Sequence, residues 1–345
     1  MKKKVAIIFG GEGAERHVSE KSAASLIRSI PKDTELLAIG IDEHGSWFIF
    51  LGGVEKIESS EWKSCADELK PTYPVRLAGR SGFYSEGNVI PVDLAFPVLH
   101  GDMGEDGTVQ GALTCAHIPY VGSAVTPSAI SADKAYTKII AEHLGIPTAP
   151  WFIPSSDMRE ARKEAEMRLG YPVFIKPRRL GSSIGASGAN DPREFAEAFE
   201  EAYSLSGGLV IIEAKINVAR ELEFALYDGK ERFISGAGSI ESHGETYSFE
   251  KKYVSEFSPK TEVNTGLDRK TLRLARSMAR RLSDYLGLGN ISRIDFFLTA
   301  SGEIIFNEIN SIPGLTDTSL YPKLVRSVIG EESFPAELFT SAKLQ

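Results

Sequence analysis

Two short segments near the end of the chain alternate apolar and polar residues with a period of two. Residues 291–298 and 304–309 follow this pattern, and a glycine-containing stretch at 299–302 separates them. The pattern is typical of strands with one buried face, so it predicts an antiparallel pair joined by a turn. The continuous apolar run at 5–9 predicts instead a strand buried on both faces, as in a parallel sheet.

The rest of the chain mixes strand and helix periodicities, which favours an α/β protein. The dipeptide Asp228-Gly229 predicts a hairpin, and Ser155 or Ser156 is the expected N-cap of a helix that follows. Mixed charges, glycines and prolines between residues 52 and 91 predict an elaborated, partly irregular segment. Further strands are expected at 36–41, 47–51, 92–99 and 209–216, and helices at 109–116, 128–144, 157–169 and 268–286.

The alternation places four polar residues on one face of the predicted strand pair. Arg293 and Asp295 come from the first strand and Glu308 and Asn310 from the second, and a two- or four-residue loop would pair Arg293 with Glu308. Oxygen donors of this kind suit Mg²⁺, which takes one or two carboxylates and leaves other positions to water and phosphate. A half-exposed sheet that carries charge only for solubility is the alternative. The four residues together favour a metal–phosphate site.

Another predicted strand delivers a lysine into a glycine- and serine-rich stretch. Lys176 ends an apolar run, and Gly181, Ser182, Ser183 and Gly185 follow. Glycines let backbone N–H groups converge on a phosphate, and serine hydroxyls add donors. The stretch is not a Walker A loop, because no Gly-Lys-Ser/Thr follows the glycines. A serine–glycine hairpin turn is the alternative, but a lysine in an apolar strand needs an anionic partner, which favours phosphate.

The first strand also runs into a glycine loop, so a dinucleotide site must be considered. Arg16 stands where the G-x-G-x-x-G fingerprint needs its last glycine, and Glu15 would crowd a pyrophosphate. A small charged substrate at the carboxyl end of the strand is expected instead. His100, which follows another strand beside glycines and acids, is a second candidate for substrate contact. The polar and aromatic segment 244–258 is expected to act as a lid.

Composition narrows the class of protein further. The 345 residues suffice for two or three domains, with 42% hydrophobic and 25% charged residues, as in ordinary globular proteins. The net charge of −8 argues against a nucleic-acid partner, and no apolar run reaches the ~18 residues of a membrane span. Cys65 and Cys115 lack metal-type spacing and are expected to be buried thiols in a reducing compartment. We therefore expect a cytoplasmic enzyme.

Seven motifs in order along the chain resemble those of the D-alanine–D-alanine ligases of the ATP-grasp superfamily. The resemblance implies a three-domain α/β (α+β) fold, with a Rossmann-like parallel sheet in residues 1–122 and two ATP-grasp units in residues 123–212 and 213–345. It implies ATP-dependent ligation of two D-alanines through an acyl phosphate, for peptidoglycan precursor synthesis, by a cytoplasmic homodimer. The motifs lie at 10–19, 100–108, 133–134, 175–185, 250–253, 293–295 and 307–314.

The resemblance also implies roles for individual residues on the nucleotide side. The stretch 217–219 is one residue longer than in the family, so Glu223 is the alternative to Glu221 as the ribose contact. The implied contacts are Lys134, Lys176 and Ser182 with the ATP phosphates, Lys252 with the terminal phosphate, Glu213 and Ile216 with the adenine, Glu221 with the ribose, and Asp295, Glu308 and Asn310 with two magnesium ions, for which manganese can substitute.

A second set of residues is implied for the reacting amino acids. By resemblance, Glu15 would hold the ammonium group of the first D-alanine and connect through Ser182 to Tyr253. His100 would contact substrate as well. The implied donors to the reaction's oxyanion are Arg293 and the Gly314 amide, and the implied pocket for the second carboxylate is formed by Ser319 and Leu320.

The identity of the acceptor stays open between two amino acids. The segment 42–91 is similar to that of the vancomycin-resistance ligases that make D-Ala–D-lactate or D-Ala–D-Ser. Tyr253 matches the amide-forming members, because ester-forming members generally carry phenylalanine there. We therefore expect D-alanine, keep D-serine as the alternative and disfavour lactate. A nucleotide-binding regulatory protein without ligase activity is the competing class, and the intact polar face of the strand pair argues against it.

Overall fold

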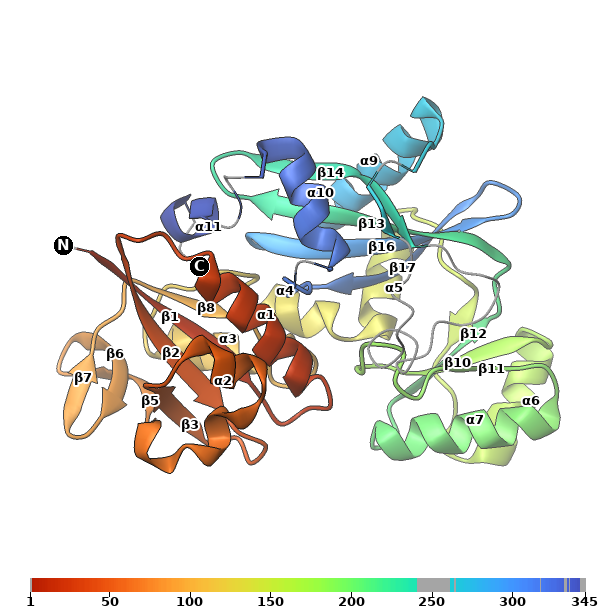
Figure 1. The fold of residues 1–345 in the computed structure, drawn as a ribbon. Helices are drawn as coiled ribbons and strands as arrows, with labels where there is room; N and C mark the ends of the chain where they lie inside the picture. Colours follow the sequence, from red (N-terminus) through yellow and green to blue (C-terminus); the bar gives the residue numbers. More distant parts are fainter. Residues whose placement is uncertain are drawn as a thin grey trace.

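The computed structural model describes residues 2–240, 261–263, 265–316, 318–331, 334 and 336–341, which fold around three larger sheets and one small one (Figure 1). The N-terminal sheet lies at the lower left of the figure and a four-stranded sheet at the lower right. The C-terminal sheet lies above them. None of the helices in the described part of the chain is both long and apolar enough to cross a bilayer.

The N-terminal sheet has the strand order β4-β3-β2-β1-β8. Its strand β1 runs parallel to β2 and β8, and residues 5–9 are fully buried, which confirms the buried parallel strand. The elements of this part are β1 (Lys3–Gly10), α1 (Arg16–Arg28), β2 (Thr34–Ile41), β3 (Trp47–Phe50), α2 (Val54–Glu58), η1 (Glu61–Ser64), η2 (Ala66–Glu68), β4 (Leu69–Pro71), β5 (Tyr73–Leu77), β6 (Arg80–Ser85), β7 (Asn88–Ile90), β8 (Leu94–Pro97) and α3 (Thr108–Cys115).

The segment between residues 52 and 91 consists of short elements joined by turns and loops, which agrees with the prediction of an elaborated, partly irregular segment. It forms α2, two 3-10 turns, the edge strand β4 and the separate antiparallel sheet β5-β6-β7. Trp62 fastens it to the domain: the ring is fully buried, and Nε1 donates to Glu20 Oε1 on α1 at 2.7 Å. These elements are three to six residues long, too short to show a periodicity.

The two thiols are more accessible than predicted. Cys115 is exposed and Cys65 is half-buried, so the prediction of buried thiols is wrong. Cys115 is the last residue of the short helix α3, where the apolar periodicity that buries Val109 and Leu113 no longer applies.

The four-stranded sheet has the order β11-β10-β12-β9, and α6 and α7 pack against it through Ala161, Phe195 and Phe199 (Figure 1). The cap of α6 differs from the prediction. Asp157 Oδ1 accepts the N–H groups of the two helical residues at 159 and 160, so neither nearby serine is the cap. The elements are β9 (Trp151–Phe152), α6 (Met158–Arg168), β10 (Val173–Pro177), β11 (Ser187–Ala189), α7 (Pro192–Leu205) and β12 (Val210–Ala214).

The C-terminal sheet has the order β15-β14-β13-β16-β17 and confirms both the predicted strand pair and the hairpin at Asp228. Its central strand β13 buries both faces: Leu222 and Phe224 contribute to the core under α5 and α9, whereas Tyr227 contributes to the core on the other side. The elements are β13 (Val218–Asp228), β14 (Arg232–Ile240), β15 (Thr261–Glu262), α9 (Arg269–Leu286), β16 (Ile291–Thr299), β17 (Ile304–Asn310), α10 (Leu320–Ile329) and α11 (Ala336–Ser341).

The predicted helix at 128–144 is two helices, α4 (Val125–Ser131) and α5 (Lys134–His143). Asp133 separates them: its backbone is extended, and its side chain accepts the Ala135 N–H at 3.0 Å as the N-cap of α5. Arg178, which directly follows β10 of the four-stranded sheet, donates from Nη2 to Oδ2 of the same buried carboxylate at 2.7 Å. Apolar spacing continues through the break, so periodicity alone could not reveal it.

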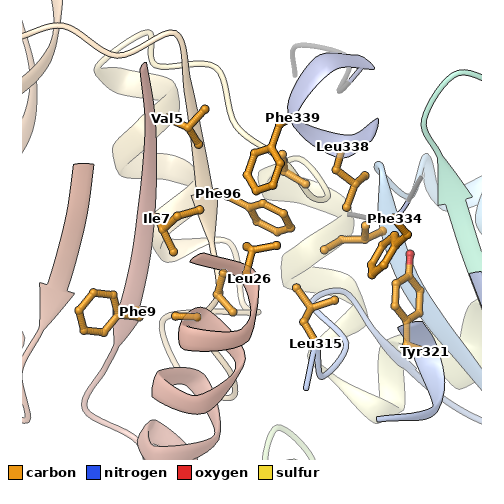
Figure 2. Packing of buried hydrophobic residues seen from close by; sticks show 14 of the residues in the cluster. Val5, Ile7, Phe9, Leu26, Phe96, Leu315, Tyr321, Phe334, Leu338 and Phe339 are labelled. Atoms are coloured by element: carbon orange, nitrogen blue, oxygen red, sulfur yellow. The ribbon is translucent and has the colours of Figure 1, made fainter. Parts of the chain in front are cut away.

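The first and last parts of the chain share one core, shown in Figure 2. Ile7 and Phe96 of the N-terminal sheet lie opposite Leu338 and Phe339 of the last helix, and the rings of Phe96 and Phe339 meet edge to face at 5.9 Å. This packing fixes the N-terminal sheet against α10 and the loop before it. Residues far apart in sequence can therefore build one site between them.

Candidate active site

The polar face of the strand pair forms with a register that differs from the prediction. Arg293 pairs with Asn310, and Asp295 pairs with Glu308, so the expected pairing of Arg293 with Glu308 is wrong. The turn and a β-bulge beside Asp295 both shift the ladder, and neither shift can be read from alternation. The four side chains still lie on one face, because paired positions project to the same side.

The bulge has a direct structural consequence. Phe296 pairs with Phe306, and the ladder resumes at the next pair with Asn307 as the extra residue. Asn307 Oδ1 then accepts from Lys176 Nζ on β10 at 3.3 Å, across to the neighbouring sheet. Bulges often re-aim side chains next to active sites. Sequence reasoning gave Asn307 no role, since an extra residue in a strand has no signature in the hydrophobic pattern.

Arg293 is the centre of this face. Its guanidinium donates in a bidentate manner to Asp295, with distances of 2.9 Å from Nε to Oδ1 and 2.7 Å from Nη2 to Oδ2. Glu223 Oε2 lies 3.4 Å from Nε, and Asn310 Nδ2 donates to Asp295 Oδ2 at 3.0 Å. Burial opposes the charge, but Asp295 and Glu223 hold the pKa of Arg293 above its ordinary value. The face is therefore a fixed set of charges with matched hydrogen bonds.

The two lysines assigned to phosphate line the same pocket. Lys176 Nζ lies 3.0 Å from Glu213 Oε2, which supplies the anionic partner that its place in a strand predicted. Lys134, at the start of α5, donates to the Leu180 carbonyl at 2.6 Å and lies 3.6 Å from Glu308. One ammonium group thus comes from a helix and the other from a strand, and both lie beside β17, near Glu308 and Asn307.

Glu213, which the resemblance assigns to the adenine, also pairs with two lysines. Its carboxylate is buried between two ammonium groups, with Lys138 3.1 Å from Oε1 and Lys176 3.0 Å from Oε2. Burial alone would raise the pKa of Glu213, but the two lysines outweigh it and lower the pKa to about 2. Sequence reasoning missed Lys138, because a lysine in a helix is ordinarily solvated.

Two of the remaining residues assigned to the nucleotide line this pocket. They are Glu221 and its alternative Glu223, and Glu223 also forms an ion pair with Arg293. Ile216 lies in the connection between β12 and β13 and is partly exposed. Lys252 lies outside the described residues.

The glycine- and serine-rich loop joins the pocket to the first part of the chain. Ser182 and Ser183 both adopt positive φ angles, 51° and 61°, which are uncommon for residues other than glycine. Such conformations cluster at functional sites, and successive ones make concavities of N–H groups. Ser182 Oγ donates to Glu15 Oε1, just before α1. Glu15 and Ser182 therefore come together as expected, whereas Tyr253 lies outside the described residues.

Two groups of the N-terminal part, the buried His100 and the half-buried Glu105, bind the loop at 311–315. His100 Nδ1 lies 3.1 Å from the Ile312 carbonyl, and Glu105 accepts the Ile312 N–H at 3.2 Å and the Gly101 N–H at 3.0 Å. Burial lowers the pKa of His100, and burial together with Glu15 raises the pKa of Glu105 to about 8. Both groups are therefore neutral near pH 7. Sequence reasoning missed Glu105, because its partner lies 207 residues further along the chain.

A cavity of about 420 Å³ lies between these loops. Glu15, His100, Gly314, Ser319 and Leu320 all line it, so the structure brings together the described residues assigned to the amino acids. A Cβ at position 314 would lie 2.9 Å from Ser319 Oγ, so a larger residue there would displace that hydroxyl. Arg293, Glu223 and Glu308 line this cavity and the lysine pocket alike.

Comparison with known proteins identifies the family. The family model for the N-terminal part of D-Ala–D-Ala ligases matches residues 4–123, and the model for the C-terminal part matches residues 140–330. A D-alanine–D-alanine ligase of Ruminiclostridium cellulolyticum is 39% identical over 94% of this chain and 90% of that protein. One of Clostridium acetobutylicum is 37% identical over 94% of this chain and 93% of that protein.

Solved structures agree with the sequence relatives. The VanG D-Ala:D-Ser ligase of Enterococcus faecalis superimposes with a TM-score of 0.86 and 33% identity, over 99% of this chain and 98% of the other. The D-alanyl-alanine synthetase A of Vibrio cholerae gives a TM-score of 0.82 with 28% identity, over 99% and 98% of the two chains. The fold is the ATP-grasp fold, as the motifs implied. The chain belongs to the D-alanine–D-alanine ligase family.

Proposed function

We propose that this protein uses ATP to join two D-alanines into D-alanyl-D-alanine, a precursor of peptidoglycan. One observation carries the proposal: Arg293 and Glu308 line both the lysine pocket and the 420 Å³ cavity. A phosphoryl group bound in the first and a carboxylate bound in the second would therefore meet at the same two side chains. The identity of 39% with a curated D-alanine–D-alanine ligase over nearly the whole chain supports this substrate.

The lysine pocket is the proposed ATP site. Lys134, Lys176 and the loop at 181–185 supply ammonium and N–H groups for the phosphates. The resemblance adds Ser182, which lines the adjoining cavity and donates its hydroxyl to Glu15. The resemblance assigns Glu213 and Ile216 to the adenine, Glu221 to the ribose and Lys252 to the terminal phosphate.

The donor set on β16 and β17 fits magnesium. Asp295 and Glu308 offer carboxylate oxygens and Asn310 an amide oxygen, all hard ligands on rigid strands. Within the described residues there is no group of three or more His, Cys, Asp or Glu side chains placed to hold a metal. A mixed set with two carboxylates fits an ion that takes its other ligands from phosphate and water. Bound there, two magnesium ions would offset the charge of the phosphoryl group in transfer.

The cavity is the proposed site of the two amino acids. Glu15 would accept from the ammonium group of the first D-alanine, and the link through Ser182 to Tyr253 would order that end of the pocket. At the start of α10, Ser319 and the Leu320 N–H group would bind the carboxylate of the second amino acid, whereas the Ser319 N–H itself donates to the Thr316 carbonyl at 3.0 Å.

The reaction then follows from the chemistry of a carboxylate. A carboxylate is a poor electrophile and must be activated before an amine can attack it. The carboxylate of the first D-alanine therefore attacks the γ-phosphorus of ATP and becomes an acyl phosphate, with ADP as the leaving group. The amine of the second D-alanine attacks the acyl carbon, and inorganic phosphate leaves. Arg293 and the Gly314 amide, which both line the cavity, would donate to the tetrahedral oxyanion. The buried junction around His100 helps to keep water from the acyl phosphate.

A product assay tests the proposal. The protein is incubated with ATP, magnesium and equimolar D-alanine, D-serine and D-lactate, and the products are identified by mass spectrometry. D-Alanyl-D-alanine with matching phosphate release is the expected result. Predominant D-alanyl-D-serine would assign the alternative acceptor, for which the likeness to VanG is the supporting observation. ATP binding without product would remove ligase activity and favour a regulatory protein.

The proposal also covers the location of the protein, its oligomeric state and its division into functional units. The chain would act in the cytoplasm, where ATP is available, and as a homodimer. Its three functional units would be residues 1–122, 123–212 and 213–345, with ATP bound between the sheets of the second and third.

A further inference from the structure

Helix α5 presents a second lysine one turn after Lys134, and this lysine is sealed inside the protein. Residues four apart lie on the same face of a helix, so Lys134 and Lys138 point in similar directions. The Lys138 side chain is 1% exposed, and its Nζ lies 3.1 Å from Glu213 Oε1. A lysine buried this deeply is costly unless it is paired, which calls for an explanation beyond surface charge.

Lys138 and Lys176 share a single carboxylate. Lys138 lies beside one oxygen of Glu213 and Lys176 beside the other, at 3.1 and 3.0 Å. Burial and the neighbouring Lys176 lower the pKa of Lys138, whereas Glu213 opposes that change. Two ammonium groups and one carboxylate leave the trio with a positive charge. Of the three groups, Lys176 is the one that lines the nucleotide pocket.

We propose that Lys138 is a positioning residue for nucleotide binding, which engages one oxygen of Glu213 so that Lys176 keeps its positive charge for a phosphate. The inference rests on the proposed ATP site. Lys176 also contacts uncharged groups, with Asn307 Oδ1 at 3.3 Å and the rings of Phe174 and Phe297 at 5.3 and 5.9 Å. The strength of the ion pair between Glu213 and Lys176 therefore sets how much positive charge this lysine offers the pocket.

Removal of Lys138 would strengthen the ion pair between Glu213 and Lys176. Both oxygens of Glu213 would then be free to chelate Lys176, and a neutral pair would replace a positive trio. The loss would fall on ligands that carry phosphates and spare those that do not. A role limited to packing would weaken both kinds of ligand alike.

The test compares ATP with adenosine, which shares the base and the sugar but lacks the phosphates. Calorimetric titration without amino acids gives the dissociation constants of both ligands for the wild-type protein and for Lys138→Met. We expect the variant to lose about tenfold or more in affinity for magnesium-ATP, the effect of one hydrogen bond to a charged group, and to keep its affinity for adenosine. Equal losses for both ligands, or no loss, would overturn the inference.

A second substitution separates charge from structure. In Lys138→Met/Glu213→Gln the carboxylate that neutralises Lys176 is gone, so the ratio of ATP to adenosine affinity should return to within about threefold of wild type. A ratio as low as in Lys138→Met alone would contradict the proposal. Lys163→Met, at an exposed position on α6, is the matched control.

Two outcomes keep the result interpretable. Circular dichroism verifies folding, and if Lys138→Met does not fold, Lys138→Gln carries the same expectation, because it is uncharged but still polar. A wild-type protein that binds neither ATP nor adenosine would count against the proposed function and not against the role of Lys138.

Discussion

The two sides of the active site keep their titratable groups in opposite states. On the nucleotide side, charges stay ionised because they are paired: the pKa of Glu213 falls to about 2, and the pKa of Arg293 rises. At the junction that borders the amino-acid cavity, burial raises the pKa of Glu105 to about 8 and lowers that of His100, so both are neutral near pH 7.

The difference follows from how each side is built. The nucleotide side is built on strands, and ion pairs connect neighbouring strands, as between Lys176 of β10 and Glu213 of β12. The junction joins segments about 200 residues apart through hydrogen bonds between the side chains of His100 and Glu105 and the backbone of Ile312. A charge is useful where phosphates bind, whereas an uncharged junction can be buried at little cost. Substitutions on the two sides should therefore fail in different ways.

The largest effect is expected on the nucleotide side. Asp295→Asn keeps the size of the side chain but removes the charge that pairs with Arg293 and that we assign to magnesium. Turnover should fall by about 10²–10³-fold, the usual cost of one preorganised electrostatic group. Phosphate release with D-alanine and ATP measures it. Glu303→Gln, exposed in the turn of the same hairpin, is the control. Turnover within threefold of wild type would remove Asp295 from the site.

On the amino-acid side, loss of a charge should weaken the binding of D-alanine and leave the binding of ATP unchanged. Glu15→Gln can still accept from Ser182 but cannot neutralise an ammonium group. The KM for D-alanine should rise by about 10–100-fold, the worth of a hydrogen bond to a charged group, while the KM for ATP stays within about twofold. Steady-state kinetics with each substrate varied gives both constants, and Glu12→Gln in the same loop is the exposed control. A parallel rise in both KM values would mean that Glu15 supports the whole site instead.

The neutral junction makes stability depend on pH. Because the pKa of Glu105 is about 8 in the folded protein against an ordinary 4.5, the folded chain keeps a proton that the unfolded chain releases. Its contribution to stability is therefore present at low pH and is lost as pH rises from about 4.5 through about 8. Glu105→Gln cannot ionise, so its Tm should fall less than that of wild type between pH 5 and 8. Thermal melting over this range measures the slope, with Glu200→Gln on α7 as the control; identical slopes would place the titration elsewhere.

The same comparison explains what the sequence could and could not predict. Alternation predicted β16 and β17 and the shared face of Arg293 and Asp295, because strand period is local. It missed the bulge at Asn307, which no hydrophobic pattern records, and the break at Asp133, where helical spacing runs through a cap. It missed Glu105, because contacts between distant segments leave no local signal. The resemblance to a family supplied what periodicity could not, namely which loops meet.

The smallest effect is expected away from both sides of the site. Asp157 caps α6 through hydrogen bonds of 2.9 and 3.0 Å to the first helical N–H groups, so Asp157→Ala should lower the free energy of unfolding by about 1 kcal/mol. Its KM and kcat values should match those of wild type, because α6 lies on the outer side of the four-stranded sheet. Ser156→Ala, at a position expected from sequence to be the cap, should leave stability unchanged. Urea unfolding of the two variants distinguishes the caps, and a larger loss for Ser156→Ala would reverse the assignment.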